Sequence, residues 1–288
     1  MYDVIIIGAG PAGITAGLYA KRANLKPLIF YEDISSLEKA EKIENYYGFI
    51  TPISGQELYR NGIEQAKNLG VEVKKEEVLN IEFIDLNKFK VITNVDEYIT
   101  KTIILATGNK RNISKISGIK KFEGKGISYC AICDGFFYRN KNVAVLGNGN
   151  YAISETNDLL NIANKITILT NGQKSPEIRA NNVETNTRQI KELHGDDKVK
   201  EVIFKDGSRL LIDGLFIAEG VAGSNEFAKK LGIIIKDNKI IVDENMQTNV
   251  KGIFACGDCT KGIMQISKAV YEGTVAGLSV IKYTKNNL

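Results

Sequence analysis

Two stretches of the chain show the same order of apolar and polar positions. In the first, the apolar residues 4–7 lead into the glycine-rich residues 8–13, and a helical pattern follows. In the second, the apolar residues 143–146 lead into residues 147–152, again followed by a helical pattern. Each stretch predicts a short buried strand, a glycine turn and an amphipathic helix, which together begin a βαβ unit. The chain is therefore predicted to contain two Rossmann-like domains.

The segment between the two glycine turns predicts the rest of the first domain's sheet and then a linker. Short alternating apolar runs within residues 71–104 predict antiparallel strands. Residues 102–108 predict a buried parallel strand that ends in a turn of small residues. Residues 114–126 are rich in Gly, Ser and Lys, which predicts a linker.

The C-terminal part of the chain is predicted to be divided between the two domains. The second domain extends through a strand at residues 214–218 to about Val242. A strand at 252–258 and a closing helix at 266–283 most simply rejoin the first domain. The predicted fold is α/β, with two Rossmann-like domains of the three-layer ββα type, in which residues 115–242 are inserted between the two parts of the first domain, 1–114 and 243–288.

Composition and charge exclude several classes of protein. The 288 residues are 43% hydrophobic and 25% charged, which is ordinary for a globular protein of two domains. A formal net charge of +4 is too small to indicate nucleic-acid binding. No apolar run approaches the roughly 18 residues of a membrane span, and the N-terminus lacks the basic region of a signal peptide. We expect a cytoplasmic protein, in which a structural disulfide would be uncommon.

The single histidine, His194, limits the catalytic options. A histidine-rich metal site or a Ser-His-Asp triad would have to depend on it alone. His194 lies in a polar stretch that predicts the end of a helix, so its expected role is that of a solvated C-terminal cap.

The first glycine turn has the pattern of a dinucleotide site. Gly8, Gly10 and Gly13 have the GxGxxG spacing, which allows a tight turn, the approach of a pyrophosphate and close packing of helix on strand. Glu32 follows 19 residues after Gly13, where an acidic residue binds ribose hydroxyls. Asp258, in a Gly-Asp pair at another strand end, is expected to contact a flavin ribityl or phosphate group. A purely structural turn is the alternative at both places.

The four cysteines form two Cys-x-x-Cys pairs. Cys130 and Cys133 lie at a predicted helix start, which stabilises a thiolate, and Asp134 can supply or accept the proton that disulfide exchange requires. These residues predict a redox-active dithiol. Cys256 and Cys259 are expected to be small buried residues beside a cofactor turn, with accessory redox chemistry as the alternative. Zinc ligation by both pairs is disfavoured, because they are 122 residues apart and the usual spacing is about 15–20.

Several motifs together resemble those of the low-molecular-weight thioredoxin reductases. They are the glycine turn at 8–13, ENYYG at 44–48, ATG at 106–108, CAICDGFFYRN at 130–140 and Gly-Asp at 257–258. They follow the family's order along nearly the whole chain, and the block that begins at residue 130 is highly specific. The resemblance implies an FAD-binding first domain and a homodimer.

The resemblance also implies a path for electrons. In the family, a cysteine pair takes electrons from the flavin and passes them to thioredoxin. By this analogy Cys133 faces the flavin, Cys130 attacks the thioredoxin disulfide, and Asp134 manages protons. Gln265, which opens the last helix, would lie near the flavin pyrimidine, where a helix N-terminus stabilises negative charge. The residues expected to bind FAD are Gly8, Gly10, Pro11, Ala12, Gly13, Tyr31, Glu32, Asn45, Val78, Thr107, Gly108, Gly257, Asp258, Gln265 and Ile266.

Three departures from the family's pattern fall where NADPH would bind. Family members follow the second strand of this domain with a His-Arg-Arg cluster and a later Arg that bind the 2′-phosphate. Here that strand is followed by residues 170–174 (TNGQK), and only Arg179 could match the later Arg. Tyr151 replaces a small hydroxyl residue in the second glycine turn and is expected to crowd a pyrophosphate. Glu219, in the stretch AEGVA (218–222), brings a carboxylate to the place where a nicotinamide nucleotide would approach.

The flavin side departs from the family as well. The family's Gly-Gly-Gln loop is absent, and residues 33–42 are shorter and charged. Met264 stands where an Arg is expected before Gln265. FAD binding is still expected, with a changed exposure of the flavin.

Four functions fit this pattern. The favoured one is a thioredoxin reductase whose electrons come from ferredoxin, because the chain resembles the ferredoxin-dependent flavin thioredoxin reductases, which lack a working NADPH site. The mild positive charge agrees with an acidic ferredoxin partner. The alternatives are a nicotinamide-dependent thioredoxin reductase with a divergent site, a related flavoprotein that reduces another disulfide, and a flavin-binding regulator. The intact Cys-x-x-Cys-Asp motif argues against the regulator.

Overall fold

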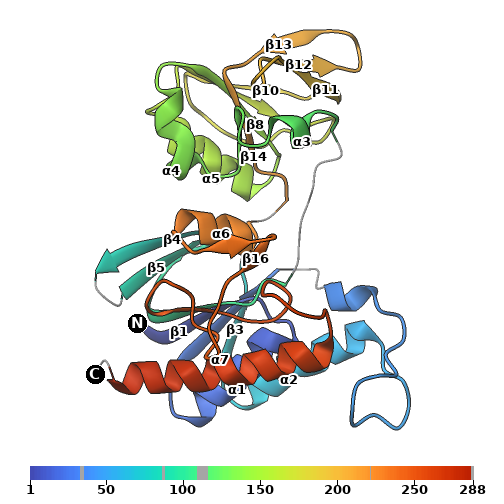
Figure 1. Cartoon of the computed structure of the whole chain (residues 1–288), viewed down its shortest axis with the longest axis vertical. Helices are drawn as coiled ribbons and strands as arrows, with labels where there is room; N and C mark the ends of the chain where they lie inside the picture. The colour runs from blue at the N-terminus through green and yellow to red at the C-terminus, as the bar shows by residue number, and fades with distance from the viewer. Residues whose placement is uncertain (33–35, 86–87, 109–115, 221, 287–288) are drawn as a thin grey trace. The chain divides into compact units, whose positions relative to one another are not determined.

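The computed structural model describes residues 1–32, 36–85, 88–108, 116–220 and 222–286 (Figure 1). Two compact units make up the described part of the chain. Unit 1 comprises Met1–Lys110 and Gly223–Leu288, and unit 2 comprises Arg111–Ala222.

The second boundary between the units lies at residue 222, where the sequence predicted residue 242. The reason is that the chain after residue 222 bonds to unit 1. The Ser224 N–H donates to Thr107 Oγ1 at 2.9 Å, and the Ile240 N–H donates to the Cys259 carbonyl oxygen at 2.9 Å. These residues therefore belong to unit 1.

Unit 1 is built on a largely parallel sheet. Its strand order is β3-β2-β1-β6-β5-β4, and β17 also pairs with β6. β1, β2, β3, β6 and β17 are mutually parallel, whereas β5 runs antiparallel to β4 and β6. The strands are β1 (Tyr2–Ile7), β2 (Pro27–Tyr31), β3 (Glu72–Lys75), β4 (Val78–Asp85), β5 (Lys88–Thr93), β6 (Glu97–Leu105) and β17 (Ile253–Ala255).

The structure confirms most of these strands and corrects the direction of one. The strand predicted at 102–108 is β6, which is parallel to β1, and β5 is antiparallel as predicted. The run at residues 71–73, also predicted to be antiparallel, leads into β3, which is parallel to β2. The helix α2 (Gly55–Asn68) lies between β2 and β3 in the chain and supplies the crossover that a parallel pair needs.

The helices α1 (Pro11–Arg22) and α7 (Ile266–Asn286) pack closely against each other. A Cβ on Gly273 would lie 2.2 Å from the Ala12 carbonyl oxygen, and one on Gly277 would lie 2.9 Å from that of Ala16. Glycine is therefore required at Gly273 for this approach. The predicted closing helix is confirmed. Unit 1 also contains η1 (Ser36–Lys39), α6 (Ser224–Lys230), β15 (Ile235–Lys236) and β16 (Lys239–Ile240).

Unit 2 has a parallel sheet and an antiparallel sheet that share one core. The parallel sheet has the order β10-β9-β8-β14-β7, and the antiparallel sheet has the order β11-β12-β13. Leu146 and Leu215 of the first sheet belong to the same buried cluster as Leu193 and Phe204 of the second. The elements are α3 (Ile119–Phe122), β7 (Ile127–Ser128), α4 (Ala131–Asp134), η2 (Gly135–Tyr138), β8 (Asn142–Leu146), α5 (Asn150–Leu159), β9 (Lys165–Leu169), β10 (Val183–Asn186), β11 (Ile190–His194), β12 (Glu201–Phe204), β13 (Arg209–Leu211) and β14 (Gly214–Ile217).

The two units confirm the predicted α/β class with two Rossmann-like domains, and two smaller predictions are wrong. The segment 114–126 is not a linker where it is described, from residue 116 on, because Ile119 and Phe122 of α3 are buried in the core of unit 2. Residues 114–115 lie outside the described residues. His194 ends the strand β11 and not a helix, with its Nδ1 3.5 Å from Glu201 Oε1.

The described residues contain no helix that is both long and apolar enough to cross a bilayer. Within the same residues, no group of three or more His, Cys, Asp and Glu side chains is placed to hold a metal ion.

Candidate active site

Six of the residues predicted to bind FAD lie at one edge of the unit 1 sheet. The parallel strands β1, β2, β6 and β17 all point toward this edge, so the residues that follow them lie side by side there. Ligands of open α/β sheets bind at the carboxyl ends of such strands. The residues placed in this way are Gly8, Glu32, Thr107, Gly108, Gly257 and Asp258.

The first glycine turn has the conformation of a pyrophosphate site. Gly8 has a φ of +114°, and a Cβ there would lie 2.3 Å from the Ala106 carbonyl oxygen. A Cβ on Gly13 would lie 1.9 Å from the Gly8 carbonyl oxygen, so only glycine lets α1 pack against the turn. Gly10 precedes the first residue of α1, and no described atom beyond its own stretch of chain lies within 4 Å of its Cβ position. Open backbone at the positive end of a helix fits the diphosphate of FAD.

The turn at Gly257 and Asp258 is held by charged residues of α7 that the sequence analysis missed. Glu272 Oε2 accepts the Gly257 N–H at 2.8 Å and the Thr260 hydroxyl at 2.8 Å. Lys268 Nζ donates to the Gly257 carbonyl oxygen at 2.7 Å and lies 3.1 Å from Glu272 Oε2. Glu272 is only 7% exposed. The available signal was a Lys and a Glu four residues apart, both of which face the buried side of the predicted helix.

Two hydrogen bonds of predicted FAD residues join segments that are far apart in the sequence. Asn45 Nδ2 donates to Gln265 Oε1 at 3.3 Å, which brings the ENYYG stretch to the start of α7. Thr107 Oγ1 bonds to the Ser224 hydroxyl and accepts the Ser224 N–H at 2.9 Å. Residue 45 is therefore joined to the residue before α7, and Thr107 is joined to the start of α6.

The remaining residues predicted to bind FAD lie in different environments. Ala12 and Val78 are buried, and Glu32 and Gln265 are exposed. Tyr31 packs edge-on against Tyr59, with ring centroids 6.5 Å apart. Pro11 is the first residue of α1, and Ile266 is the first residue of α7. Of the segment predicted at 33–42, residues 33–35 lie outside the described residues and Ser36–Lys39 form η1.

The three predicted catalytic residues lie within one turn of chain in unit 2. Cys130 and Cys133 are joined as a disulfide, and Cys130 Sγ accepts the Cys133 N–H at 3.1 Å at the start of α4. Ser128 Oγ accepts the Cys130 N–H at 3.1 Å and donates to Asp134 Oδ2 at 2.6 Å. Ser128, which the sequence analysis missed, therefore orients Asp134 beside the pair. Cys130 is 2% exposed, whereas Cys133 is exposed.

Tyr151 does not crowd the second glycine turn, and the prediction that it does is wrong. Its side chain is 2% exposed and turns into the interior of unit 2. The Tyr151 hydroxyl donates to the Tyr129 carbonyl oxygen at 3.0 Å. A large aromatic side chain near a helix start can pack inward, where burial of its ring is favourable and its hydroxyl finds an acceptor.

The second glycine turn lies against the stretch that follows β14. Gly147 has a φ of +154°, and a Cβ there would lie 2.1 Å from the Ala218 carbonyl oxygen. The nearest described atom to the Cβ position of Gly149 is the Gly220 carbonyl oxygen, at 3.7 Å. Glu219, between these two contact residues, therefore lies beside the turn. Val221 lies outside the described residues.

The turn after β9, where the family's 2′-phosphate cluster would lie, is closed by its own side chains. The Thr170 hydroxyl donates to the Gln173 carbonyl oxygen at 2.8 Å. Asn171 Oδ1 accepts the Ile190 N–H at 2.8 Å, and the Gly172 N–H donates to the Thr187 carbonyl oxygen at 2.9 Å. The polar groups of Thr170 and Asn171 are thus used to shape the turn.

Cys256 and Cys259 are buried free thiols, as predicted. Cys259 Sγ donates to the Leu105 carbonyl oxygen at 3.3 Å. Burial raises the pKa of the Cys259 thiol to about 11 and the pKa of the Cys256 thiol well above its ordinary value. Because the thiolate is the reactive form, this pair is poorly suited to disulfide exchange.

Comparison with known proteins relates the whole chain to one family. Residues 2–273 match the family model described as pyridine nucleotide-disulphide oxidoreductase. A curated thioredoxin reductase of Aquifex aeolicus is 38% identical over 98% of this chain and 93% of its own length. This chain belongs to the thioredoxin reductases of that family. The resemblance seen in the motifs is therefore confirmed, and the cofactor of this thioredoxin reductase is FAD, as in the rest of the family.

Two solved thioredoxin reductases are similar along almost their whole length. The atypical thioredoxin reductase TRi from Desulfovibrio vulgaris Hildenborough is 37% identical, with a TM-score of 0.92 and 99% of each chain covered. A ferredoxin-flavin thioredoxin reductase from Clostridium acetobutylicum is 32% identical, with a TM-score of 0.74 and coverage of 99% of this chain and 98% of that one.

Gly10→Val tests the placement of the FAD diphosphate in this thioredoxin reductase. We expect the purified variant to hold less than about a tenth of the wild-type flavin, because the side chain would fill the open space at the start of α1. Flavin content follows from the ratio of absorbance at 450 and 280 nm. Gly149→Val, at the matching position of the second glycine turn, is the control and should keep its flavin. Full occupancy in Gly10→Val would contradict this placement.

Proposed function

We propose that this thioredoxin reductase takes its electrons from a reduced ferredoxin and not from a nicotinamide nucleotide. The electrons would pass by way of FAD and the Cys130–Cys133 pair to the disulfide of thioredoxin. Reduction of that disulfide consumes two electrons and two protons, so two one-electron donors must react in each cycle. FAD, when bound, supplies the carrier that joins the one-electron donor to the two-electron disulfide.

The observation that carries this proposal is the closed turn after β9. A site that binds the 2′-phosphate of NADPH needs arginine side chains, whose planar guanidinium groups each donate two hydrogen bonds to a phosphate. Thr170 and Asn171 bond within the turn and to the backbone of residue 190, and Lys174 is the one cationic side chain in the sequence 170–174. Loss of several charge-assisted hydrogen bonds, at about 1.5–3 kcal/mol each, weakens a micromolar cofactor to about millimolar or beyond.

Glu219, beside the second glycine turn, also argues against a nicotinamide nucleotide as the donor. The backbone of residues 218–220 lies against the glycine turn 147–149. A carboxylate beside this turn disfavours the approach of a negatively charged dinucleotide. A protein donor does not need to enter the turn at all.

The names of two solved relatives support a donor other than NADPH. The solved relative from Clostridium acetobutylicum is a ferredoxin-flavin thioredoxin reductase, and that from Desulfovibrio vulgaris is named atypical. The positive net charge of this chain also favours encounter with an acidic ferredoxin.

A nicotinamide-dependent thioredoxin reductase is the second candidate, and the second glycine turn favours it. The positive φ of Gly147 and the space at Gly149 keep the backbone open to a diphosphate. Tyr151 turns away from this space to bond to the Tyr129 carbonyl oxygen. A nucleotide without a 2′-phosphate would avoid the closed turn after β9 but would still meet Glu219.

We propose that the two thiols of the redox pair divide their roles. The exposed Cys133 is suited to face the flavin, and Cys130 is proposed to attack the thioredoxin disulfide once the intramolecular bond has opened. Asp134, held by the Ser128 hydroxyl at 2.6 Å, is proposed to carry the protons. Cys256 and Cys259 are free thiols, which agrees with a reducing compartment, and we propose the cytoplasm.

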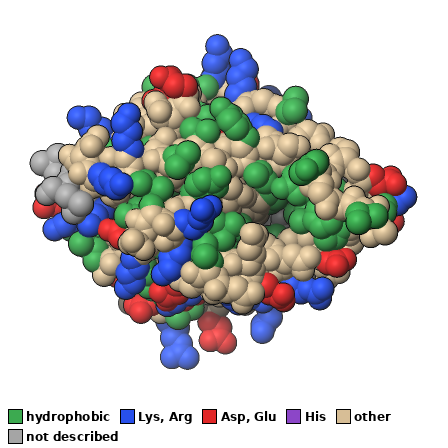
Figure 2. Space-filling model, turned by 90° about the horizontal axis from the view of Figure 1, so that it is seen from below, with side chains coloured by type: hydrophobic (Ala, Val, Ile, Leu, Met, Phe, Trp, Pro, Cys, Tyr) green, Lys and Arg blue, Asp and Glu red, His purple; other side chains and the backbone are tan. Residues whose placement is uncertain are grey.

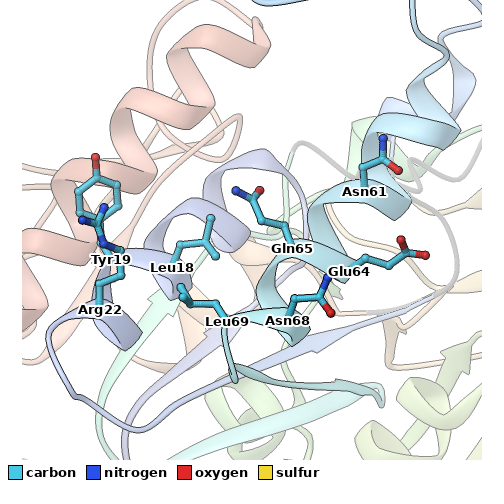
Figure 3. A pocket seen from close by; sticks show the side chains of 8 residues that line it. All are labelled: Leu18, Tyr19, Arg22, Asn61, Glu64, Gln65, Asn68 and Leu69. Carbon is cyan, nitrogen blue, oxygen red and sulfur yellow. The ribbon is translucent and has the colours of Figure 1, made fainter.

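We further propose a homodimer that forms through the face of unit 1 on which α7 and α1 lie. Figure 2 shows hydrophobic side chains gathered on this face, with Lys and Arg around them. Tyr271 and Leu278 of α7 are 64% and 51% exposed. A groove of about 690 Å³ between α1 and α2 adds Leu18 and Leu69 to the apolar surface (Figure 3). Exposed apolar patches of this kind are typical of protein–protein contacts.

The electron donor can be tested by anaerobic titration of the flavin. Millimolar NADPH or NADH is expected to leave the flavin oxidised over minutes, whereas reduced ferredoxin bleaches it and supports thioredoxin reduction. Gly149→Val is the matched control, because it closes the second glycine turn and should not change reduction by ferredoxin. If tens of micromolar NADPH bleach the wild type rapidly and Gly149→Val abolishes that reaction, the second candidate is correct.

Serine variants test the division of roles between the thiols. Cys130→Ser and Cys133→Ser should both lose thioredoxin reduction. Only Cys130→Ser, which keeps Cys133, should show the long-wavelength absorbance of a thiolate in contact with the flavin. Cys256→Ala is the control and should keep most activity, because its thiol is buried and rarely ionised. The same absorbance in both serine variants would contradict the assignment.

The homodimer can be tested by placing charge on α7. The double variant Tyr271→Glu/Leu278→Glu is expected to have half the wild-type mass in light scattering after gel filtration, because a twofold interface would bring four new carboxylates together. Leu211→Glu changes a residue of unit 2 that is 75% exposed and serves as the control, with the wild-type mass expected. A monomeric wild type, or an unchanged mass for the double variant, would refute the proposed interface.

A further inference from the structure

The helix α5 holds the chain on both sides of Cys130. The Tyr151 hydroxyl donates to the carbonyl oxygen of Tyr129, at 3.0 Å, and Glu155 Oε2 accepts the N–H of Ala131, at 2.6 Å. Tyr151 and Glu155 are four residues apart, so they lie on the same face of the helix one turn apart. The two backbone groups they bind belong to the residues immediately before and after Cys130.

Glu155 is an unusual residue in this position because it is buried. Glu155 is 1% exposed. Its Oε2 accepts the N–H of Ala131, the first residue of α4. An N–H at the start of a helix ordinarily stabilises a thiolate next to it. Here that N–H points to a carboxylate instead, and the carboxylate adds negative charge close to the Cys130–Cys133 pair. Both effects disfavour a thiolate and oppose the Cys133 N–H, which donates to Cys130 Sγ at 3.1 Å.

We propose that Tyr151 and Glu155 are positioning residues of the Cys130–Cys133 pair, and that Glu155 destabilises the thiolate form of the reduced pair. The proposal rests on the redox role proposed above for this pair. The helix α5 follows the second glycine turn, where a nucleotide site would begin. By this proposal the same helix also supports the turn that carries Cys130 and Cys133.

The electron and proton balance defines what Glu155 changes. Opening the disulfide takes two electrons and yields either two thiols, with uptake of two protons, or one thiol and one thiolate, with uptake of one proton. A nearby negative charge disfavours the second product. Without that charge the reduced pair is more stable at alkaline pH, where the thiolate forms, and unchanged at acidic pH, where both sulfurs carry protons. Titratable groups around the pair include Asp134 of α4, Tyr129, Tyr151 and Glu155, and Tyr138 of η2, whose pKa is raised by burial and by the carboxylates of Asp134 and Asp213.

The test measures the thiol–disulfide equilibrium of the full-length flavoprotein in dithiothreitol buffers between pH 6 and 9.5. Samples are quenched in acid and alkylated after denaturation, and the peptide that carries both cysteines is quantified by mass spectrometry, so burial of Cys130 does not matter. Comparison of variant and wild type at each pH cancels the titration of dithiothreitol itself. The measurement requires neither ferredoxin, nicotinamide nor thioredoxin, so it is independent of the proposed donor.

Glu155→Gln keeps the acceptor oxygen and removes the charge. We expect its equilibrium constant for reduction to equal that of the wild type at pH 6 and to be about tenfold higher at pH 9.5, or about 30 mV for a two-electron couple. Glu177→Gln, which removes an exposed carboxylate of the same unit, should give a ratio of one at every pH. A ratio of one at every pH for a folded Glu155→Gln would overturn the electrostatic role.

Two further variants keep the proposal testable. If Glu155→Gln does not fold, Glu155→Asp draws the charge back by one methylene, and a ratio that rises with pH to a smaller value is expected; a constant ratio of one would overturn the role. Tyr151→Phe removes only a hydroxyl. It should speed amide hydrogen exchange in residues 128–134 several-fold, relative to β12, with no pH-dependent change of the equilibrium. Unchanged exchange there would refute the positioning role of Tyr151.

Discussion

Backbone contacts that tolerate no side chain set the geometry of the FAD edge. A Cβ on Gly8 would collide with the Ala106 carbonyl oxygen, and one on Gly13 would collide with Gly8 itself. Gly273 makes the same kind of contact between α7 and Ala12. Because these approaches are so close, the start of α1 lies directly against the residue that follows β6 and against α7. The open position at Gly10 has functional meaning only because its neighbours are packed this tightly.

Each unit also uses a buried glutamate to hold its functional turn. In unit 1, Glu272 of α7 accepts the Gly257 N–H, and in unit 2, Glu155 of α5 accepts the Ala131 N–H. A buried carboxylate is costly unless it is hydrogen-bonded, so such a residue fixes the turn strongly once it is in place. In unit 1 the ammonium group of Lys268 lies 3.1 Å from the carboxylate and offsets its charge. In unit 2 the Glu155 carboxylate accepts the N–H of the residue that follows Cys130, and its charge is proposed to act on the thiols.

The two Cys-x-x-Cys pairs differ because Cys133 is the one exposed thiol position among the four, all of which are described. Cys130 and Cys133 begin α4, and Cys133 is exposed to a reaction partner. Cys256 and Cys259 follow β17 in the interior of unit 1, where loss of solvent raises the pKa of both thiols. The spacing of the cysteines is identical, so the local motif does not distinguish a reactive dithiol from a packed one. The neighbouring residues make the distinction. The first pair has a helix start and is followed by Asp134, whereas the second pair encloses a Gly-Asp turn.

The sequence alone determined the α/β class, the two glycine turns, the closing helix and the family, because these depend on local periodicity and on residues close together in the chain. It also identified the cysteine pair at 130–133, whose motif is contiguous. Only the tertiary structure decided which residues that are far apart in the chain contact one another. Tyr151 stands in a glycine turn in the sequence, yet it bonds to the Tyr129 carbonyl oxygen from the interior. The second domain ends at residue 222 and not 242, and residues 119–122 enter a core. In each case the deciding contacts join residues far apart in the chain, and periodicity carries no information about such contacts.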